Sequence, residues 1–344
     1  MNRQTEMYLG HESQISGVEE VRLVGGRGDG MRLLQVRNGK GLEFTVSVDR
    51  CADLSRLSYR GGNYGYFSPC GYVHPSYYDG VGNGFLKSFT AGFLTTCGLN
   101  AVGMPCTDEG EELPLHGTIG NTPADHVWWN RTDRGIEIRA TIRDERIFAH
   151  RLVLERTWIC SEQENTLSLR DKVMNQGGEP YPVEILYHMN MGYPLLSEES
   201  LLYIPSSQVK PRNSHAAVDL ESWNKMLPPT VGFEEQCYFH QFENQGVAAI
   251  YSPLLGTGLV IRFSPQNLPY FTQWKMMGVG DYALGLEPGN CHPDGRSQMR
   301  AEGALTILKP GEAAEYEVNL QILENCAEFQ RLSSCKDEEE GVLC

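Results

Sequence analysis

Residues 135–175 read GIEIRATIRDERIFAHRLVLERTWICSEQENTLSLRDKVMN, and this stretch decides the fold class. Apolar side chains alternate with polar ones along its three runs, GIEIRATIRD, RLVLERTWIC and NTLSLRDKVMN. A period of two is typical of a β-strand with one buried face, whereas an α-helix repeats every 3.6 residues or so. The stretch therefore predicts successive strands joined by short polar connections, as in an antiparallel sheet.

The same pattern recurs along most of the chain. Further strand-like runs are MRLLQVRN, LEFTVSVDR, PVEILYHM, GVAAIYSP, TGLVIRFS, YALGLEPG, GALTILKP and AEYEVNLQIL. Turn signals such as NGKG, NQGGEP, LLGTG and KPGE accompany them. Strand and helix patterns do not alternate, so we expect an all-β protein, an antiparallel sandwich or barrel.

Helical periodicity is weak elsewhere, and only two short segments carry it. These are SHAAVDLESWNKML (214–227) and ENCAEFQRL (324–332). No internal repeat and no Pro/Ser-rich linker divides the chain, so we expect one domain over residues 1–344. The acidic residues near the C-terminus predict a solvated tail at about 333–344.

The composition argues against several classes of partner. The chain has 344 residues and a formal net charge of −15, whereas nucleic acids and anionic membrane surfaces attract a basic face. A neutral sugar, or a small anion held by local arginines, is compatible with this charge. No segment has the apolar length of a signal peptide or a membrane span, so we expect a cytoplasmic protein. The ten cysteines form no C-x-x-C pair, so we expect reduced thiols rather than a zinc site or a disulfide framework.

Residues 61–126 differ from the strand-like runs in their residue pattern. They have no clear period and are rich in Gly, Tyr, Ser and Thr. Long aperiodic segments in compact domains usually exist because they build a site. We therefore expect this segment to line a pocket.

Three residues of acid–base type lie at turns or strand ends. His116 precedes a glycine in PLHGTIGN, His188 ends the strand-like run ILYHMN, and Glu287 precedes a Pro-Gly turn in YALGLEPGN. Each has an ordinary alternative role, since a loop histidine can cap backbone groups and a carboxylate at a strand end is often only solvated. A base, an acid and amide donors in one cleft are the groups that proton transfer requires, so we take the three as candidates for one site.

Other polar residues accompany these candidates. Asn190 lies two residues after His188 and so on the same face of the strand, where a ligand or an internal network would have to satisfy it if it is buried. In FTQWK, the ring of Trp274 flanked by Gln273 and Lys275 suits a sugar, because an apolar ring face lies beside hydrogen-bonding groups.

Arg50 and Asp53 follow another strand, in SVDRCADLSRL. A structural salt bridge is the more frequent role of such a pair. Substrate binding is the alternative, and we carry both residues as candidates for it.

Five motifs occur in order along the chain: LHGTIGN (115–121), LYHMNMGYPLL (186–196), FEEQCYFH (233–240), FTQWK (271–275) and GLEPGN (285–290). Read together, they resemble the aldose 1-epimerase (galactose mutarotase) superfamily. An uncharacterised aldose 1-epimerase-like branch is more similar, because the chain also carries DRCADLSRLSYRGGNYGYFSPCG (49–71) and FLTTCGLNAVG (93–103). The resemblance covers most of the chain, from about residue 45 to GALTILKPGE (303–312).

The resemblance implies a large antiparallel β-sandwich with a sugar site on the concave face of one sheet. It also implies that Glu287 is the general base at the anomeric hydroxyl, His188 the general acid at the ring oxygen, and His116 a binding or polarising group. Ring opening removes a proton from the O1 hydroxyl and delivers one to the ring oxygen, so no cofactor is expected. An ionised glutamate and a protonated histidine, near its ordinary pKa of about 6.5, would perform this close to neutral pH.

The chain also departs from the family pattern. In typical members the strand histidine is followed by Pro, an aromatic pair and Asn, whereas this chain has HMNMGYP (188–194). The aspartate that often binds the sugar hydroxyls has no obvious counterpart, although Glu235 stands near its position. Arg50 belongs to the branch-specific stretch, and an arginine can pair with a carboxylate or phosphate. We therefore expect the ligand to be a small carbohydrate, and an acidic or phosphorylated sugar is compatible with this expectation.

Three functions are compatible with these residues. The leading hypothesis is a carbohydrate mutarotase or epimerase. The second is a metal-dependent sugar isomerase or epimerase, because His116, His188 and Glu287 could equally form a two-His-one-carboxylate site. The third is a non-catalytic carbohydrate-binding protein. An exposed sheet edge would also permit a homodimer.

Overall fold

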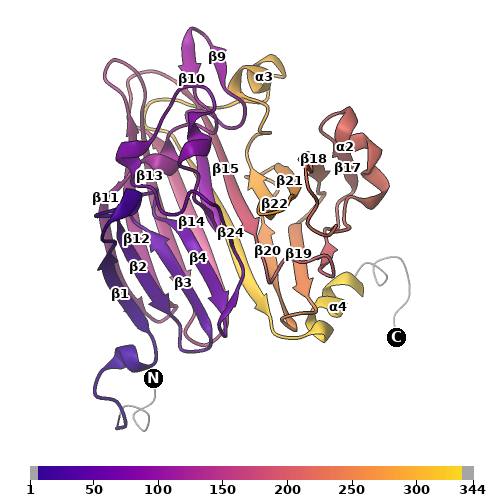
Figure 1. The fold of residues 1–344 in the computed structure, drawn as a ribbon. Coiled ribbons are helices and arrows are strands. Elements are labelled where there is room, and N and C mark those ends of the chain that lie inside the picture. The colour runs from indigo at the N-terminus through magenta and orange to yellow at the C-terminus, as the bar shows by residue number, and fades with distance from the viewer. Residues whose placement is uncertain (1–6, 335–344) are drawn as a thin grey trace.

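The three runs that alternate in the sequence form neighbouring strands in the structure, a computed structural model that describes residues 7–334 (Figure 1). Their register places Trp158 opposite Ile138 on one side and Leu169 on the other, so three buried side chains lie in a row. They belong to an eight-stranded antiparallel sheet whose order is β11 (Ala124–Thr132), β12 (Gly135–Glu145), β13 (Arg151–Cys160), β14 (Thr166–Asn175), β24 (Ala313–Leu323), β20 (Thr257–Phe263), β19 (Gly246–Ser252) and β16 (Leu201–Tyr203). The predicted antiparallel β fold is confirmed.

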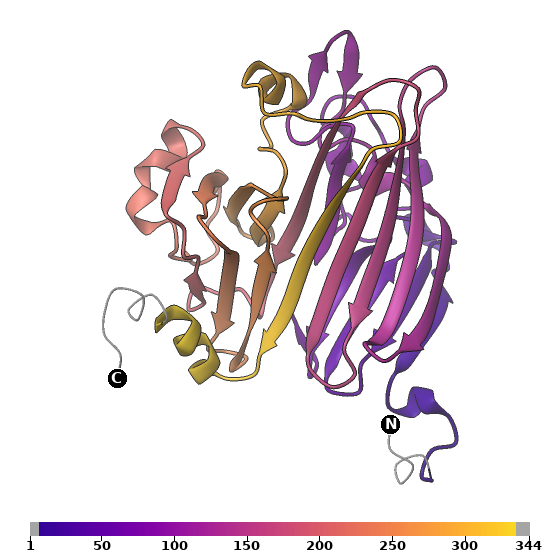
Figure 2. The ribbon, with the colours of Figure 1, turned by 180° about the vertical axis from the view of Figure 1, so that it is seen from behind.

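Two further sheets lie next to each other and form the second layer (Figures 1 and 2). One is five-stranded, in the order β1 (Gly17–Arg22), β2 (Arg32–Arg37), β3 (Leu42–Ser47), β4 (Asp53–Tyr59) and β5 (Gly62–Asn63). The other contains β17 (Gln208–Pro211), β18 (Gln236–Gln241), β21 (Tyr270–Met277), β22 (Tyr282–Gly289), β15 (Tyr181–Met191) and β23 (Thr306–Leu308), with β8 (Leu94–Leu99) also paired to β15. The result is a large β-sandwich.

Smaller elements complete the chain. Two small two-stranded sheets pair β6 (Tyr66–Phe67) with β7 (Ala91–Gly92) and β9 (Cys106–Asp108) with β10 (Glu111–Leu113). The α-helices are α2 (Ser214–Val218), α3 (Arg296–Ala301) and α4 (Cys326–Ser334). The 3₁₀ helices are Glu12–Gln14, Gly26–Gly28, Pro75–Tyr77, Gly84–Lys87, Ile119–Asn121 and Leu220–Ser222. No helix in the described part of the chain is long and apolar enough to cross a membrane.

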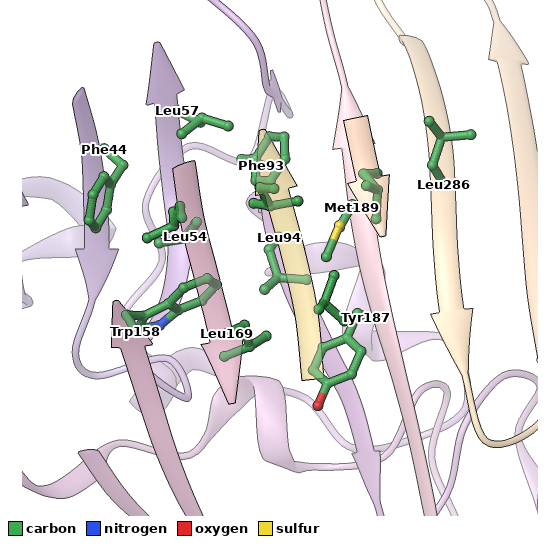
Figure 3. Packing of buried hydrophobic residues seen from close by; sticks show 14 of the residues in the cluster. Phe44, Leu54, Leu57, Phe93, Leu94, Trp158, Leu169, Tyr187, Met189 and Leu286 are labelled. Atoms are coloured by element: carbon green, nitrogen blue, oxygen red, sulfur yellow. The ribbon is translucent and has the colours of Figure 1, made fainter. Parts of the chain in front are cut away.

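The core fills the space between the layers (Figure 3). Phe44 and Leu54 of the five-stranded sheet pack in one cluster with Trp158 and Leu169 of the eight-stranded sheet, and none of the four is more than 3% exposed. The indole Nε1 of Trp158 donates a hydrogen bond to the carbonyl of Ala52 at 2.9 Å. Since burying such a side chain contributes about 1.5–3 kcal/mol, this cluster is what holds the two layers together.

A buried ion-pair network crosses the same core. Arg156 of β13 donates to Asp53 of β4 and, through Nε at 2.9 Å and Nη2 at 2.6 Å, to Asp171 of β14. The hydroxyl of Tyr187 on β15 donates to Asp171 at 2.9 Å, and Thr96 on β8 accepts from Arg156 at 2.8 Å. The network therefore ties β15 and β8 to the eight-stranded sheet, directly behind the strand that carries His188.

The two helix predictions have different outcomes. The C-terminal helix is confirmed, as α4, while the acidic tail predicted at 333–344 lies outside the described residues apart from Ser333 and Ser334. The helix predicted at 214–227 is wrong for most of its length, because α2 ends at Val218 and only a 3₁₀ turn follows. The carbonyls of Trp223 and Lys225 accept hydrogen bonds from side chains of β21, so these two carbonyls bond to the sheet rather than to a following turn of helix.

Candidate active site

A cavity of about 310 Å³ lies against the seven-stranded sheet. Strands β15, β21 and β22, which are neighbours in that sheet, supply His188, Thr272, Trp274 and Glu287 to its wall (Figure 1). Strand β18 adds Cys237, and the 3₁₀ helix Gly84–Lys87 adds Phe85 and Leu86. The rest of the lining comes from loops: Asn83, Phe89, Gly103, Met104, Leu115, His116, Arg212, Glu235 and Pro293. Segment 61–126, which the sequence predicts to line a pocket, thus contributes about half of all the lining residues.

His188 and Glu287 face each other across two paired strands. The register of β15 and β22 pairs Met189 with Leu286, which places His188 opposite Glu287. Their side chains are 8% and 2% exposed, and Nδ1 of His188 lies 3.2 Å from Oε1 of Glu287. Neither atom has a well-aligned hydrogen bond within the protein. The pair is close enough for proton exchange, and both atoms keep the capacity to bond elsewhere.

Burial controls the protonation of this pair. Loss of solvent lowers the pKa of His188 to about 4 and raises the pKa of Glu287 well above its ordinary value. The nearby Glu235 carboxylate raises the Glu287 pKa further, and Arg212 opposes that rise. The imidazole of His188 is therefore neutral near neutral pH and the proton of the pair is favoured on Glu287, which corrects the expectation of a protonated His188.

His116 is held by its own backbone conformation. Its φ of 59° lies in the left-handed region, and Gly103 accepts a hydrogen bond from its N–H at 2.9 Å. The N–H of Gly103 in turn donates to the imidazole Nδ1 at 3.3 Å, so we assign the proton of the neutral ring to Nε2. Burial, with His188 and Arg212 nearby, lowers the His116 pKa to about 3. His116 is thus a neutral hydrogen-bond donor at neutral pH.

Aromatic rings surround the two histidines. The ring centroid of His188 lies 5.6 Å from that of His116, 5.4 Å from that of Phe89 and 5.4 Å from that of Trp274. Phe85 packs against His116 at 5.3 Å. A cavity with aromatic walls and a few polar groups is the usual form of a site for a small organic ligand.

Comparisons with known proteins place the chain in a family. A family model described as "Domain of unknown function (DUF4432)" matches residues 28–322. The chain belongs to this family. No curated protein matches the DUF4432 chain.

Solved structures show what the DUF4432 protein is similar to. A Klebsiella pneumoniae protein described as a candidate aldose 1-epimerase is 27% identical, with a TM-score of 0.86 over 94% of this chain and 88% of that one. A galactose mutarotase-like protein from Clostridium acetobutylicum is 15% identical, with a TM-score of 0.62 over 90% and 99%. Galactose 1-epimerase from Lactobacillus acidophilus is 13% identical, with a TM-score of 0.60 over 90% and 99%. The DUF4432 protein therefore has the galactose mutarotase-like fold, and the resemblance seen in the sequence is confirmed.

The arginine and aspartate proposed from the sequence as substrate ligands do not border the cavity of the DUF4432 protein. Asp53 accepts hydrogen bonds from Thr96 N at 2.7 Å and Thr96 Oγ1 at 2.6 Å, besides its ion pair with Arg156. Arg50 donates to the carbonyl of Val73 at 2.9 Å, and burial lowers its pKa to about 10. The assignment of both residues to this cavity is therefore wrong, because they are buried and bonded to groups within the core.

Strand alternation corrects two further candidates. Trp274 faces the cavity, and its Nε1 donates to Oε2 of Glu235 at 2.7 Å. Gln273 and Lys275 point to the opposite face of β21, where Gln273 bonds to His240 at 3.1 Å and Lys275 donates to the carbonyl of Lys225 at 2.8 Å. Their assignment to the sugar site is therefore wrong.

Asn190 supports the site without lining it. Its side chain is fully buried, and its Nδ2 donates to the carbonyl of His188 at 2.9 Å. Its backbone N–H donates to the carbonyl of Phe93 at 2.8 Å. Asn190 therefore helps to fix the backbone of β15 at His188, which is the internal one of the two alternatives considered from the sequence, and it is not among the residues that line this cavity.

The cavity also contains polar residues that the sequence did not reveal. Arg212 borders it, with Nε on Asp294 at 2.8 Å and Nη2 on the carbonyl of Pro293 at 3.2 Å. Thr272 pairs with Glu287 in the register, and its buried Oγ1 has no hydrogen-bond partner. Alternation with Trp274 could have identified Thr272, whereas nothing in the local sequence around Arg212 marks it.

No set of three His, Cys, Asp or Glu side chains among residues 7–334 is arranged to hold a metal ion. The two-His-one-carboxylate site considered from the sequence is therefore not preassembled in this part of the chain. Eight cysteines in the same residues are free thiols, and Cys237 among them borders the cavity.

Proposed function

We propose that this DUF4432 protein is a carbohydrate mutarotase or epimerase that interconverts sugar anomers by acid–base ring opening. The observation that carries the proposal is the buried contact of 3.2 Å between His188 Nδ1 and Glu287 Oε1 at the wall of an aromatic cavity. Similarity to the Klebsiella pneumoniae and Lactobacillus acidophilus proteins supports the same class of reaction.

The proton of the pair completes a balanced cycle. It passes from Glu287 to Nδ1 of His188, which leaves a carboxylate beside an imidazolium. Glu287 then takes the proton of the anomeric hydroxyl while Nε2 of His188 delivers its proton to the ring oxygen, and the C1–O5 bond breaks. Rotation of the aldehyde and reversal of the two transfers closes the ring as the other anomer. No redox change occurs, and the pair returns with its single proton.

The remaining lining groups have binding roles in this proposal. Nε2–H of His116 donates to a sugar oxygen, Trp274 provides an apolar face, and Glu235 with Arg212 offers an acceptor and a donor for hydroxyl groups. Arg212, rather than Arg50, is the arginine that an acidic or phosphorylated sugar would meet. Asp294 already engages Arg212 and Glu235 is nearby, so the cavity offers an anion little net positive charge.

The test is anomeric exchange measured by NMR on a panel of neutral, acidic and phosphorylated aldoses and ketoses. We expect at least one sugar to exchange faster with the protein than without it, before and after treatment with a chelator. Exchange that disappears on chelation and returns with added metal would support a metal-dependent isomerase instead. Binding without exchange for the whole panel would support a carbohydrate-binding protein.

A further inference from the structure

The carboxylate of Glu287 folds back over a glycine on its own strand. Gly285 lies two residues before Glu287 on β22, so both residues belong to one face of the strand. A Cβ atom built on Gly285 would lie 2.1 Å from Oε1 of Glu287 and 2.9 Å from Cβ of Trp274. The space that a side chain would fill at residue 285 is thus occupied by the reactive end of Glu287.

The same oxygen is the one that meets the histidine. Oε1 of Glu287 is buried and lies 3.2 Å from Nδ1 of His188. Gly285 pairs with Trp274 in the register, and Oε1 of Glu287 lies where a side chain of residue 285 would begin. Any atom added at Gly285 must therefore displace Oε1 from the position in which it exchanges a proton with His188.

We infer that Gly285 is a positioning residue whose missing side chain sets the place of the Glu287 carboxylate. The inference deepens the proposed function and rests on it. Gly285 does not have the left-handed φ that requires glycine, so its backbone accepts alanine. The closest contact of the added Cβ is with the end of the Glu287 side chain, which can rotate away, and the contact of 2.9 Å with Cβ of Trp274 requires a smaller shift of β21. We therefore expect alanine at residue 285 to lower the stability of the fold without preventing folding, and to move the carboxylate of Glu287 out of its position beside His188.

The experiment compares Gly285→Ala with a matched control, Gly278→Ala. At Gly278 the added Cβ would lie 3.1 Å from the terminal methyl of Met276 and 3.2 Å from the carbonyl of Asp281, outside the cavity. Because a misplacement of roughly 1 Å can cost about 100-fold in rate, we expect kcat for anomeric exchange to fall about 100-fold in Gly285→Ala, with a much smaller change in KM. Gly278→Ala should keep the wild-type rate. A folded Gly285→Ala protein with wild-type kcat would overturn the inference.

Two readouts do not depend on turnover. The imidazole ¹⁵N shifts of His188 should change in Gly285→Ala and stay unchanged in Gly278→Ala. Adding Glu287→Ala to Gly285→Ala should recover most of the lost melting temperature, because the clash with the carboxylate is then absent and only the contact with Cβ of Trp274 remains. If these results hold while wild-type protein exchanges no sugar, the proposed function fails and the placement of Glu287 by Gly285 stands. Unchanged His188 shifts, or a loss of stability that Glu287→Ala does not relieve, would overturn the inference.

Discussion

His188 and Glu287 share one proton because their surroundings exclude water. Each charged form loses solvation on burial, which favours the neutral imidazole and the protonated carboxyl. In the proposed mechanism, the ionic form differs from this neutral form only by the transfer of one proton between His188 Nδ1 and Glu287 Oε1, which lie 3.2 Å apart. A sugar whose ring oxygen and O1 hydroxyl bond to the two groups would stabilise that ionic form, since these bonds would replace the solvation that both groups lose on burial.

The pH dependence of kcat/KM follows from these shifts. At low pH both members of the pair hold protons, so activity is lost as the pH falls through the His188 pKa of about 4. At high pH the last proton leaves, and because the Glu287 pKa is raised, this loss begins well above the ordinary glutamate range. We therefore expect a plateau bounded by these two losses, measured as initial exchange rates across both limbs. A profile with a single midpoint near the ordinary histidine value of about 6.5 would contradict this assignment.

At the scale of elements, strand alternation and the buried ion pairs decide which side chains reach the cavity. On β21 the side chains of Thr272 and Trp274 line the cavity. Gln273 and Lys275 point to the other face of the strand, where they donate hydrogen bonds to the carbonyls of Trp223 and Lys225. Behind β15, Tyr187 bonds to Asp171, which Arg156 also binds. The strand that presents His188 is therefore fixed from its rear face.

Removing the guanidinium of Arg156 should destabilise the buried ion-pair network. Arg156→Leu leaves Asp53 and Asp171 buried without their partner, which should lower the free energy of unfolding by about 3–5 kcal/mol. The matched control is Arg170→Leu on the neighbouring strand, whose pair with Glu317 is about half exposed and should contribute within about 1 kcal/mol. Urea denaturation of the two variants measures the difference. Equal and small losses would show that the buried network does not stabilise the fold.

At the scale of the whole molecule, the cavity joins segments that are far apart in sequence. Phe85, His116, His188 and Glu287 come from four regions of the chain and meet at one site. A bound sugar should therefore stabilise the fold as a unit. At 100 times its Kd, a ligand that binds only the folded state adds about 2.7 kcal/mol. On addition of the sugar, we expect the melting temperatures of wild type and of Glu287→Gln to rise by similar amounts. If only the wild-type melting temperature rises, the prediction that the variant still binds the sugar is contradicted.

The sequence predicts the fold much better than the details of the site, for physical reasons. The alternation in RLVLERTWIC depends only on local residues and matches β13 (Arg151–Cys160). Which face of a strand meets the cavity depends on the neighbouring elements, so the local sequence does not show that Gln273 and Lys275 point away from the cavity. The partner of Asp53 is Arg156, 103 residues away, and no local pattern indicates it. The protonation state of His188 also cannot be predicted from the sequence, because its pKa depends on its burial in the folded protein.

The most direct measurement is the anomeric exchange rate, by two-dimensional exchange NMR, of a sugar that binds both wild type and Glu287→Gln. We expect the two proteins to bind the sugar with similar affinity, and exchange to fall at least 100-fold in the variant, since general acid–base catalysis contributes about 10² to 10⁴. The same exchange rate in both proteins at equal occupancy would contradict the account, because the carboxylate of Glu287 would then have no part in opening the ring.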